Sequence, residues 1–166
     1  MDLKTERLNI RELNSALDAE FICALLNTPK FIKYIGDRGV RTAENAAAFI
    51  DDRYRQSYRD HGYGLYAVEL KDGTQIGMCG FVRRDTLPGP DIGFAFLPEF
   101  ERQGFGYESA AAMMKYGHEA FGFTTVYAIT SPDNDASGSL LEKLGFAFDK
   151  MIENGDDTVK LFVSSI

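Results

Sequence analysis

The stretch from Pro98 to Ala111 joins an apolar, strand-like run to an alanine-rich, helix-like run, and it contains the pair Gly104 and Gly106. Glycine adopts backbone conformations that other residues resist, so successive N–H groups can converge on one point. That point lies at the start of a helix, where the helix dipole also favours negative charge. The stretch therefore predicts a strand, a glycine turn and a helix that cradle an anion, and a pyrophosphate suits such a site.

A second polar segment follows about thirty residues later. It reads Asn-Asp-Ala-Ser-Gly-Ser over residues 134–139 and continues as Leu-Leu-Glu-Lys-Leu-Gly-Phe over residues 140–146. The pattern predicts a loop and a short helix that ends at Gly145. With the glycine turn and the opening Thr-Glu-Arg-Leu-Asn-Ile-Arg of residues 5–11, it resembles the GNAT superfamily of acetyl-CoA-dependent N-acetyltransferases. The closer resemblance is to the ribosomal-protein N-terminal acetyltransferase branch, and it runs from about Thr5 to the C-terminus.

Length and charge limit what the chain can be. At 166 residues it is long enough for one well-buried core and short for two, so we expect one domain over residues 1–166. Its composition, 45% hydrophobic and 26% charged, is that of a globular protein. The formal net charge of -7 disfavours binding to nucleic acid or to an anionic membrane, and mildly favours a cationic acceptor.

Two cysteines, Cys23 and Cys79, are interpreted as buried thiols rather than a disulfide framework, which fits a reducing compartment. The N-terminus has no apolar signal-like region, and no run approaches the length of a membrane span, so the cytoplasm is the expected location. No Cys or His stands at metal-ligand spacing, and we expect no metal. Monomer and homodimer both remain open.

Residue periodicity and turn signals predict an α/β fold with a mixed central sheet and helices on both faces, in the order β-α-α-β-β-β-α-β-α-β-β. Asp72-Gly73 and Asn154-Gly155 predict hairpins. The expected strands lie near residues 8–10, 63–70, 75–82, 91–97, 125–130, 146–153 and 158–163. The expected helices lie near residues 17–25, 42–61 and 106–121 and after Asn134, with an irregular connection over residues 31–41.

The glycine pair also approximates the fingerprint of a dinucleotide-binding Rossmann fold. In that fold the first glycine directly follows the strand, whereas here six residues, including Pro98, separate Leu97 from Gly104. No acidic residue stands about twenty positions after the glycines to bind a ribose hydroxyl. A P-loop is also excluded, because no Lys-Ser or Lys-Thr follows them.

The resemblance implies a specific place for the coenzyme. The main chain of Phe94, Ala95 and Phe96 would pair with the pantetheine arm of acetyl-CoA as an added strand would. Backbone N–H groups of the loop would hold the pyrophosphate. The loop residues are Arg102, Gln103, Gly104, Phe105, Gly106 and Tyr107.

In the family, the residue at Asn134 contacts the coenzyme arm and the residue at Ser137 lies near the thioester sulfur. Both could instead be simple helix caps, a role that Asn and Ser fill in many proteins. Two other positions depart from the family pattern. Many members have Gln or Arg where this chain has Glu101, and many have a tyrosine acid where it has Leu141, although the ribosomal-protein branch commonly has leucine there.

The resemblance implies direct attack of a primary amine on the thioester, the amine being that of a peptide N-terminus or a small molecule. An α-amino group, with a pKa near 8, needs less help from a base than a lysine side chain near 10.4. The candidate bases Asp91, Glu69 and Glu108 could each equally be structural carboxylates. We predict Asp91 and Ser137 as catalytic residues. The alternative function is a non-catalytic acyl-CoA-binding or regulatory module, which Leu141 and the uncertain base leave open.

Overall fold

The computed structural model describes residues 1–165, and its centre is one eight-stranded sheet in the order β1-β2-β3-β4-β5-β6-β8-β7. Its strands are β1 (Asp2–Lys4), β2 (Leu8–Glu12), β3 (Leu65–Leu70), β4 (Gln75–Val82), β5 (Asp91–Phe96), β6 (Thr125–Thr130), β7 (Ala147–Asn154) and β8 (Asp157–Ser165). Neighbouring strands are antiparallel except β5 and β6, which are parallel. The predicted mixed α/β sheet is therefore confirmed. A Rossmann fold has a mostly parallel sheet, so this largely antiparallel sheet is not of that type.

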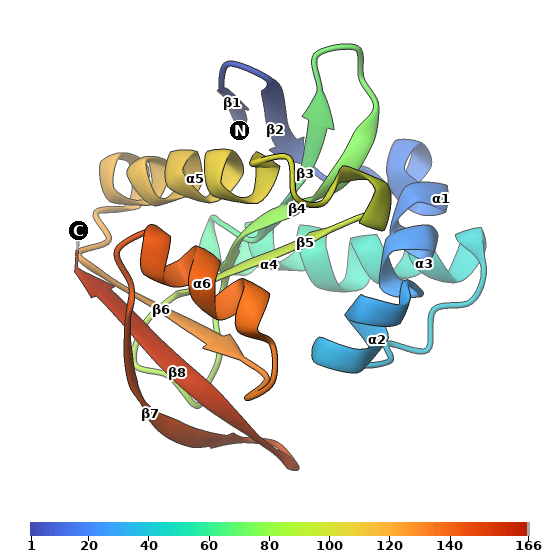
Figure 1. Ribbon diagram of the computed structural model, residues 1–166. Helices are drawn as coiled ribbons and strands as arrows, with labels where there is room; N and C mark the ends of the chain where they lie inside the picture. Colours follow the sequence, from blue (N-terminus) through green and yellow to red (C-terminus); the bar gives the residue numbers. More distant parts are fainter. Residues whose placement is uncertain (166) are drawn as a thin grey trace.

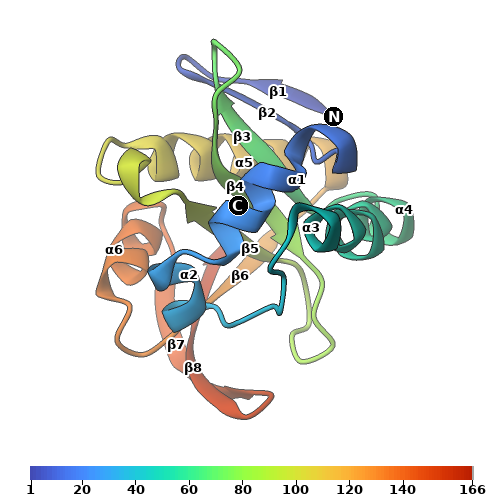
Figure 2. The same ribbon diagram turned by 90° about the vertical axis from the view of Figure 1, so that its right-hand side faces the viewer.

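Within residues 1–165, six α-helices flank this sheet. They are α1 (Ser15–Leu26), α2 (Pro29–Tyr34), α3 (Ala43–Phe49), α4 (Gln56–His61), α5 (Phe105–Phe121) and α6 (Asp135–Lys143), with a π-helical turn η1 (Ile50–Arg55) between α3 and α4 and a short 3₁₀ turn η2 (Pro98–Phe100) after β5. The helices α5 and α6 lie on one side of the sheet, and α3 and α4 lie on the other (Figure 1, Figure 2).

Two hydrophobic clusters, one on each side of the sheet, hold these layers together. Ala110 and Met113 of α5 are fully buried in one cluster, together with Phe81 of β4. Ile22 of α1 and Ala46 of α3 are fully buried in the other. Burial of apolar side chains is the dominant favourable contribution to folding, so both helical layers are firmly fixed to the sheet.

Most local predictions are confirmed, and three are corrected. The strand β1 was not predicted; it is three residues long and pairs with β2 at the edge of the sheet. Pro29 does not only close α1, because it also occupies the first turn of α2, where a missing N–H costs nothing and Thr28 caps the helix. The irregular connection is therefore shorter than predicted. Cys79 is buried as expected, but Cys23 is only half-buried, and both thiols are free.

The helix predicted over residues 42–61 is found as α3, η1 and α4 in unbroken succession. Thr42 caps its start by accepting a hydrogen bond from the N–H of Asn45, and Gly62 ends it in the left-handed conformation. Both predicted hairpins are present, with Gly73 and Gly155 at positive φ. Within residues 1–165, no helix has the length and apolar character needed to cross a membrane.

The parallel strands β5 and β6 open a gap in the middle of the sheet. They are in register only at Asp91 and Tyr127, and Figure 1 shows them diverging from there toward their C-terminal ends. Beyond β6, the hydroxyl of Ser131 donates a hydrogen bond to the carbonyl oxygen of Tyr34 at 2.9 Å. This bond attaches the end of α2 to the segment that follows β6, on the open side of the gap.

Candidate functional site

The loop between β5 and α5 has a sharply bent backbone. Arg102 has a φ of 61° and Gly104 a φ of 85°, so two left-handed residues flank Gln103. A left-handed conformation is uncommon for a residue with a side chain, and it is concentrated at functional turns. Position 104 therefore has the backbone conformation for which the sequence predicted a glycine. Gly106 has no positive φ, and the prediction that it too relaxes the backbone is wrong.

The first turn of α5 is open to an anion. Gly104 precedes the helix, and no side chain caps its N-terminus. The first main-chain bond of the helix runs from the N–H of Glu108 to the carbonyl oxygen of Gly104, at 3.0 Å. The N–H groups of Phe105, Gly106 and Tyr107 therefore precede the helical ladder, and the positive end of the helix dipole adds to their attraction for an anion.

Gly106 has a packing role instead. A Cβ at this position would lie 3.1 Å from Cδ2 of Leu140 in α6 and 3.8 Å from the ring of Phe96 in β5. Glycine therefore lets α5 and α6 come close together at the end of the cradle.

Arg7 supports the loop from behind, which sequence reasoning missed. Its Nη1 donates a hydrogen bond to the carbonyl oxygen of Gln103 at 2.9 Å, and its Cζ lies 4.4 Å from the ring centre of Phe105. Its Nε is 2.7 Å from Oε1 of Glu108, whose other oxygen accepts from Thr5 Oγ1 and from the N–H of Arg7. The signal was present in the Thr-x-Arg opening at residues 5–7, but only tertiary structure shows what it contacts.

The remaining edge of β5 is free along most of its length. On one side it pairs with β4, with Phe94 opposite Cys79 and Ala95 opposite Met78. On the other side the pairing with β6 is confined to Asp91 among the described residues. Backbone groups between Ile92 and Phe96 can therefore accept an added extended chain in the gap.

The α6 residues lie beside the open end of the gap. Asn134 caps α6, and its Oδ1 accepts a hydrogen bond from the N–H of Ser137 at 3.3 Å, so the capping interpretation holds in the protein as it stands. Leu141 is 1% exposed and belongs to the core, where it cannot supply a proton. Thr130, the last residue of β6, was not predicted; its buried hydroxyl has no hydrogen-bond partner among residues 1–165, and the residue lines a cavity together with the α6 cap Asn134 and Phe162 of β8.

Asp91 lies at the closed end of the gap. It is 1% exposed, and the Nε of Arg84 is 3.1 and 3.2 Å from its two carboxylate oxygens. Burial raises the pKa of this carboxyl to about 6, although the charge of Arg84 opposes the rise. The loop is at the other end of β5, about 17 Å away at roughly 3.4 Å per residue. The structure therefore does not bring Asp91 next to the anion cradle.

The other two candidate bases are held in ion pairs. Glu69 accepts from Arg11 at 3.2 Å, and Glu108 accepts from Thr5 and Arg7. Partial burial would raise the pKa of Glu108, but these hydrogen bonds outweigh it and hold that pKa below its ordinary value. Asp91, whose pKa burial raises to about 6, is suited to accept a proton near neutral pH.

Glu101 does not leave an unpaired negative charge beside the cradle. Its Oε2 lies 2.5 Å from Nζ of Lys30, at the start of α2. The departure from the family pattern at this position is therefore compensated by a cation from another element. The described residues contain no cluster of three His, Cys, Asp or Glu side chains that could hold a metal ion.

Comparison with known proteins agrees with this geometry. Residues 7–147 match the acetyltransferase (GNAT) domain family. The uncharacterized N-acetyltransferase YoaA of Bacillus subtilis (strain 168) is 30% identical over 146 residues, which cover 87% of this chain and 81% of YoaA. An acetyltransferase from Agrobacterium tumefaciens superposes with a TM-score of 0.84 at 21% identity, covering 100% of this chain and 95% of its own. RimL, a ribosomal α-N-protein acetyltransferase in complex with coenzyme A, superposes with a TM-score of 0.76 at 14% identity, covering 100% and 98%.

The family match over residues 7–147 includes both the open start of α5 and the split between β5 and β6. The chain belongs to the acetyltransferase (GNAT) family and is an acetyltransferase. Acetyl-CoA is the acyl donor of that family, and the predicted family assignment is confirmed.

Proposed function

We propose that this protein transfers the acetyl group of acetyl-CoA to a primary amine, with the α-amino group of a peptide as the favoured acceptor. The proposal applies to one domain over residues 1–166. The observation that carries it is the uncapped start of α5 at the end of β5, beside a free strand edge. Such a site suits a ligand that combines a pyrophosphate with an extended amide chain.

The residues of this chain have separate roles in that proposal. Backbone N–H groups from Arg102 to Tyr107 hold the pyrophosphate. The edge formed by Phe94, Ala95 and Phe96 holds the pantetheine arm. Asn134 orients the start of α6 toward the gap.

The bound coenzyme supplies an activated acetyl group as a thioester. The arm runs from the loop along β5 toward Asp91, and an unpaired backbone N–H of β5 near that end polarises the thioester carbonyl oxygen. Asp91, with a pKa of about 6, is a carboxylate at pH 7 and accepts the proton of the incoming amine through water. In this proposal, Ser137 returns a proton to the departing sulfur. The favoured acceptor is an α-amino group, because its pKa near 8 leaves a useful neutral fraction.

The first test is a calorimetric titration with acetyl-CoA, with NAD as comparator. Gly104→Val should abolish binding, because a β-branched residue resists a φ of 85° and its Cβ would lie 3.2 Å from Nη2 of Arg7. Gly122→Val is the matched control: it imposes the same strain at φ 71°, at the opposite end of α5, where a Cβ meets nothing within 4 Å. Equal loss of binding in both variants would contradict the cradle.

The second step is a panel of amines, assayed by release of free thiol. Two results together would support the proposed reaction: the wild type acetylates peptide α-amines, and Asp91→Asn lowers this turnover without changing the affinity for acetyl-CoA. Tight binding of acetyl-CoA without turnover on any amine would instead favour a binding module. The ribosomal-protein acetyltransferases suggest which peptide sequences to include, and the cytoplasm is the compartment in which such acceptors occur.

A further inference from the structure

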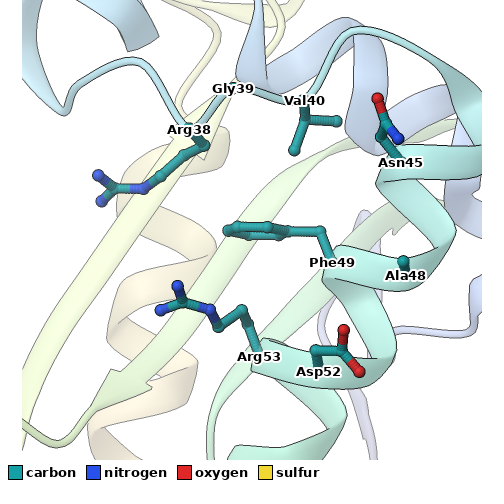
Figure 3. A pocket seen from close by; sticks show the side chains of 8 residues that line it. All are labelled: Arg38, Gly39, Val40, Asn45, Ala48, Phe49, Asp52 and Arg53. Carbon is teal, nitrogen blue, oxygen red and sulfur yellow. The ribbon is translucent and has the colours of Figure 1, made fainter.

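A shallow depression separates the connection after α2 from α3 and η1 (Figure 3). It has a volume of about 320 Å³. Its lining residues are Arg38, Gly39, Val40, Asn45, Ala48, Phe49, Asp52 and Arg53. The composition is unusual for so acidic a chain, because two arginines and an aromatic ring occupy the same small surface.

The two guanidinium groups converge. Figure 3 shows the side chains of Arg38 and Arg53 projecting in the same direction on either side of the Phe49 ring. The Cζ of Arg53 lies 5.7 Å from the centre of that ring. Among residues 1–165 neither guanidinium forms an ion pair, whereas Arg41, from the same connection, pairs with Asp37.

The charges of the two arginines also act on the same buried group, the phenol of Tyr54. Burial raises the pKa of the Tyr54 phenol, and the charges of Arg38 and Arg53 both act against that rise. Asp52 lines the depression, but Figure 3 shows its carboxylate pointing away from the two guanidinium groups. Two cations facing one space without a carboxylate between them repel each other, so a bound anion would be stabilised there.

The depression and the coenzyme cradle are associated with opposite faces of the sheet. Val40 and Phe49 pack in the same hydrophobic cluster as Ala95 and Leu97 around β5. The cradle residue Phe105 and the α6 residue Leu141 belong to the cluster on the opposite face. The end of α2, just before this connection, is attached beyond the gap through the bond between Ser131 and Tyr34. An acceptor that approaches the gap from the α1–α3 side therefore passes this surface.

We propose that Arg38 and Arg53 bind a carboxylate of the acceptor, and that Phe49 packs against the apolar part that carries it. Arginine presents a planar fork of donors that matches a carboxylate in two-point geometry. The preferred acceptor is accordingly an amine that carries a carboxylate, such as a peptide with an acidic residue near its N-terminus. This reverses the weak preference for a cationic acceptor that the net charge of -7 suggested. The inference rests on the proposed acetyltransferase function toward amines.

The test uses acceptors that differ in one carboxylate. Two tripeptides with amidated C-termini carry either glutamate or glutamine at the second position, and free alanine is compared with alaninamide to separate a peptide from a small amino acid. Arg38→Gln, Arg53→Gln and the double variant are compared with Arg59→Gln, which removes an exposed arginine of α4 that does not line the depression.

The wild-type enzyme should have a KM at least tenfold lower for the glutamate peptide than for the glutamine peptide. The double variant should lose that preference by raising the KM of the glutamate peptide alone, with kcat nearly unchanged and Arg59→Gln without effect. Equal KM values in the wild type, or a preference that survives in the double variant, would overturn the proposal. A preference for alanine over alaninamide, without one between the peptides, would assign the site to a free amino acid.

Direct binding separates this inference from the proposed function. The affinity for each peptide is measured by calorimetry in the presence of coenzyme A, where no acetyl group can be transferred. Selective binding of the glutamate peptide that depends on both arginines supports the carboxylate site even if no amine is acetylated. Acetylation of both peptides without selective binding keeps the proposed function and rejects the site.

Discussion

Nη1 of Arg7 donates a hydrogen bond to the carbonyl oxygen of Gln103 at 2.9 Å, and this bond joins the first turn of the chain to the anion loop. Gln103 lies between the two left-handed residues of the loop, so the bond holds the most strained part of the backbone. Arg7 therefore helps to fix the backbone of the loop whose N–H groups form the cradle.

Arg7→Ala should weaken acetyl-CoA binding about tenfold or more, because the loop loses its bond to Gln103 and its packing on Phe105. A charge-assisted hydrogen bond is worth about 1.5–3 kcal/mol, which agrees with that factor. The dissociation constant is measured by calorimetry. Lys115→Ala, which removes an exposed ion pair with Glu119 on the same helix, should leave it unchanged. Unaltered binding in Arg7→Ala would show that the loop keeps its conformation without the arginine.

The pH dependence of turnover should report Asp91. With the carboxyl pKa at about 6 and an acceptor amine near 8, log kcat/KM should rise with a slope of two below pH 6 and of one between pH 6 and 8. Asp91→Asn should give a slope of one throughout and at least a tenfold loss at pH 7. Glu69→Gln removes a carboxylate that is paired with Arg11 and should keep the wild-type slopes. A slope of two that persists in Asp91→Asn would exclude Asp91 as the base.

Ionisation of the Asp91 carboxyl should lower the free energy of unfolding as the pH rises, whereas a carboxyl in an ordinary salt bridge raises it. The pKa of Asp91 in the folded protein is raised to about 6, above the value of about 3.9 in an unfolded chain. Its contribution is therefore fully present below pH 4 and is lost as the pH rises through 6, by about 3 kcal/mol. Urea unfolding of the wild type and of Asp91→Asn between pH 4 and 8 measures it. The difference between the two proteins should change between pH 4 and 6 and be constant above; a constant difference over the whole range would contradict the raised pKa.

Asp18 should be important for stability without a role in the reaction. Its carboxylate is fully buried and accepts from Arg11 at 2.8 and 2.9 Å, from the N–H of Asn14 and from Gln75. Burial alone would raise its pKa, but these hydrogen bonds hold it below the ordinary value. Its stabilising contribution is therefore present above about pH 4 and is lost as the pH falls further.

Asp18→Asn should accordingly lower the free energy of unfolding at pH 7 by about 3 kcal/mol, because it breaks a buried ion pair. Urea unfolding checks this value. Asp37→Asn breaks the exposed pair with Arg41 and should change stability little. Similar losses in the two variants would indicate that the buried network contributes no more than a surface pair.

Gly106→Ala should weaken acetyl-CoA binding several-fold, because the added Cβ lies 3.1 Å from Leu140 and moves α6 away from α5. A second substitution, Leu140→Ala, removes the contact and should restore most of the affinity. Calorimetry on the single and double variants measures both effects. If the double variant binds no better than Gly106→Ala, the close packing of the two helices is not what the glycine provides.

Local signals predicted much of the fold. Asp72-Gly73 and Asn154-Gly155 predicted their hairpins because a tight turn needs positive φ at a fixed place, and Gly62 ended its helix for the same reason. Thr42 and Asn134 were recognisable as caps because a capping side chain bonds to the backbone only a few residues away. All of these interactions are complete within a short segment.

Interactions between distant segments decided the rest. The bond from Arg7 to Gln103 joins residues 96 positions apart, and the pairing of β1 with β2 needs a sheet edge to be available. The meeting of Arg38 with Arg53 depends on how the connection after α2 returns along η1. The opening between β5 and β6 depends on two parallel strands that keep only one residue pair in register. The sequence by itself determined the turns, the caps and the family, because these depend on adjacent residues, whereas the tertiary structure decided which charged groups support the anion loop and which lie together at the depression.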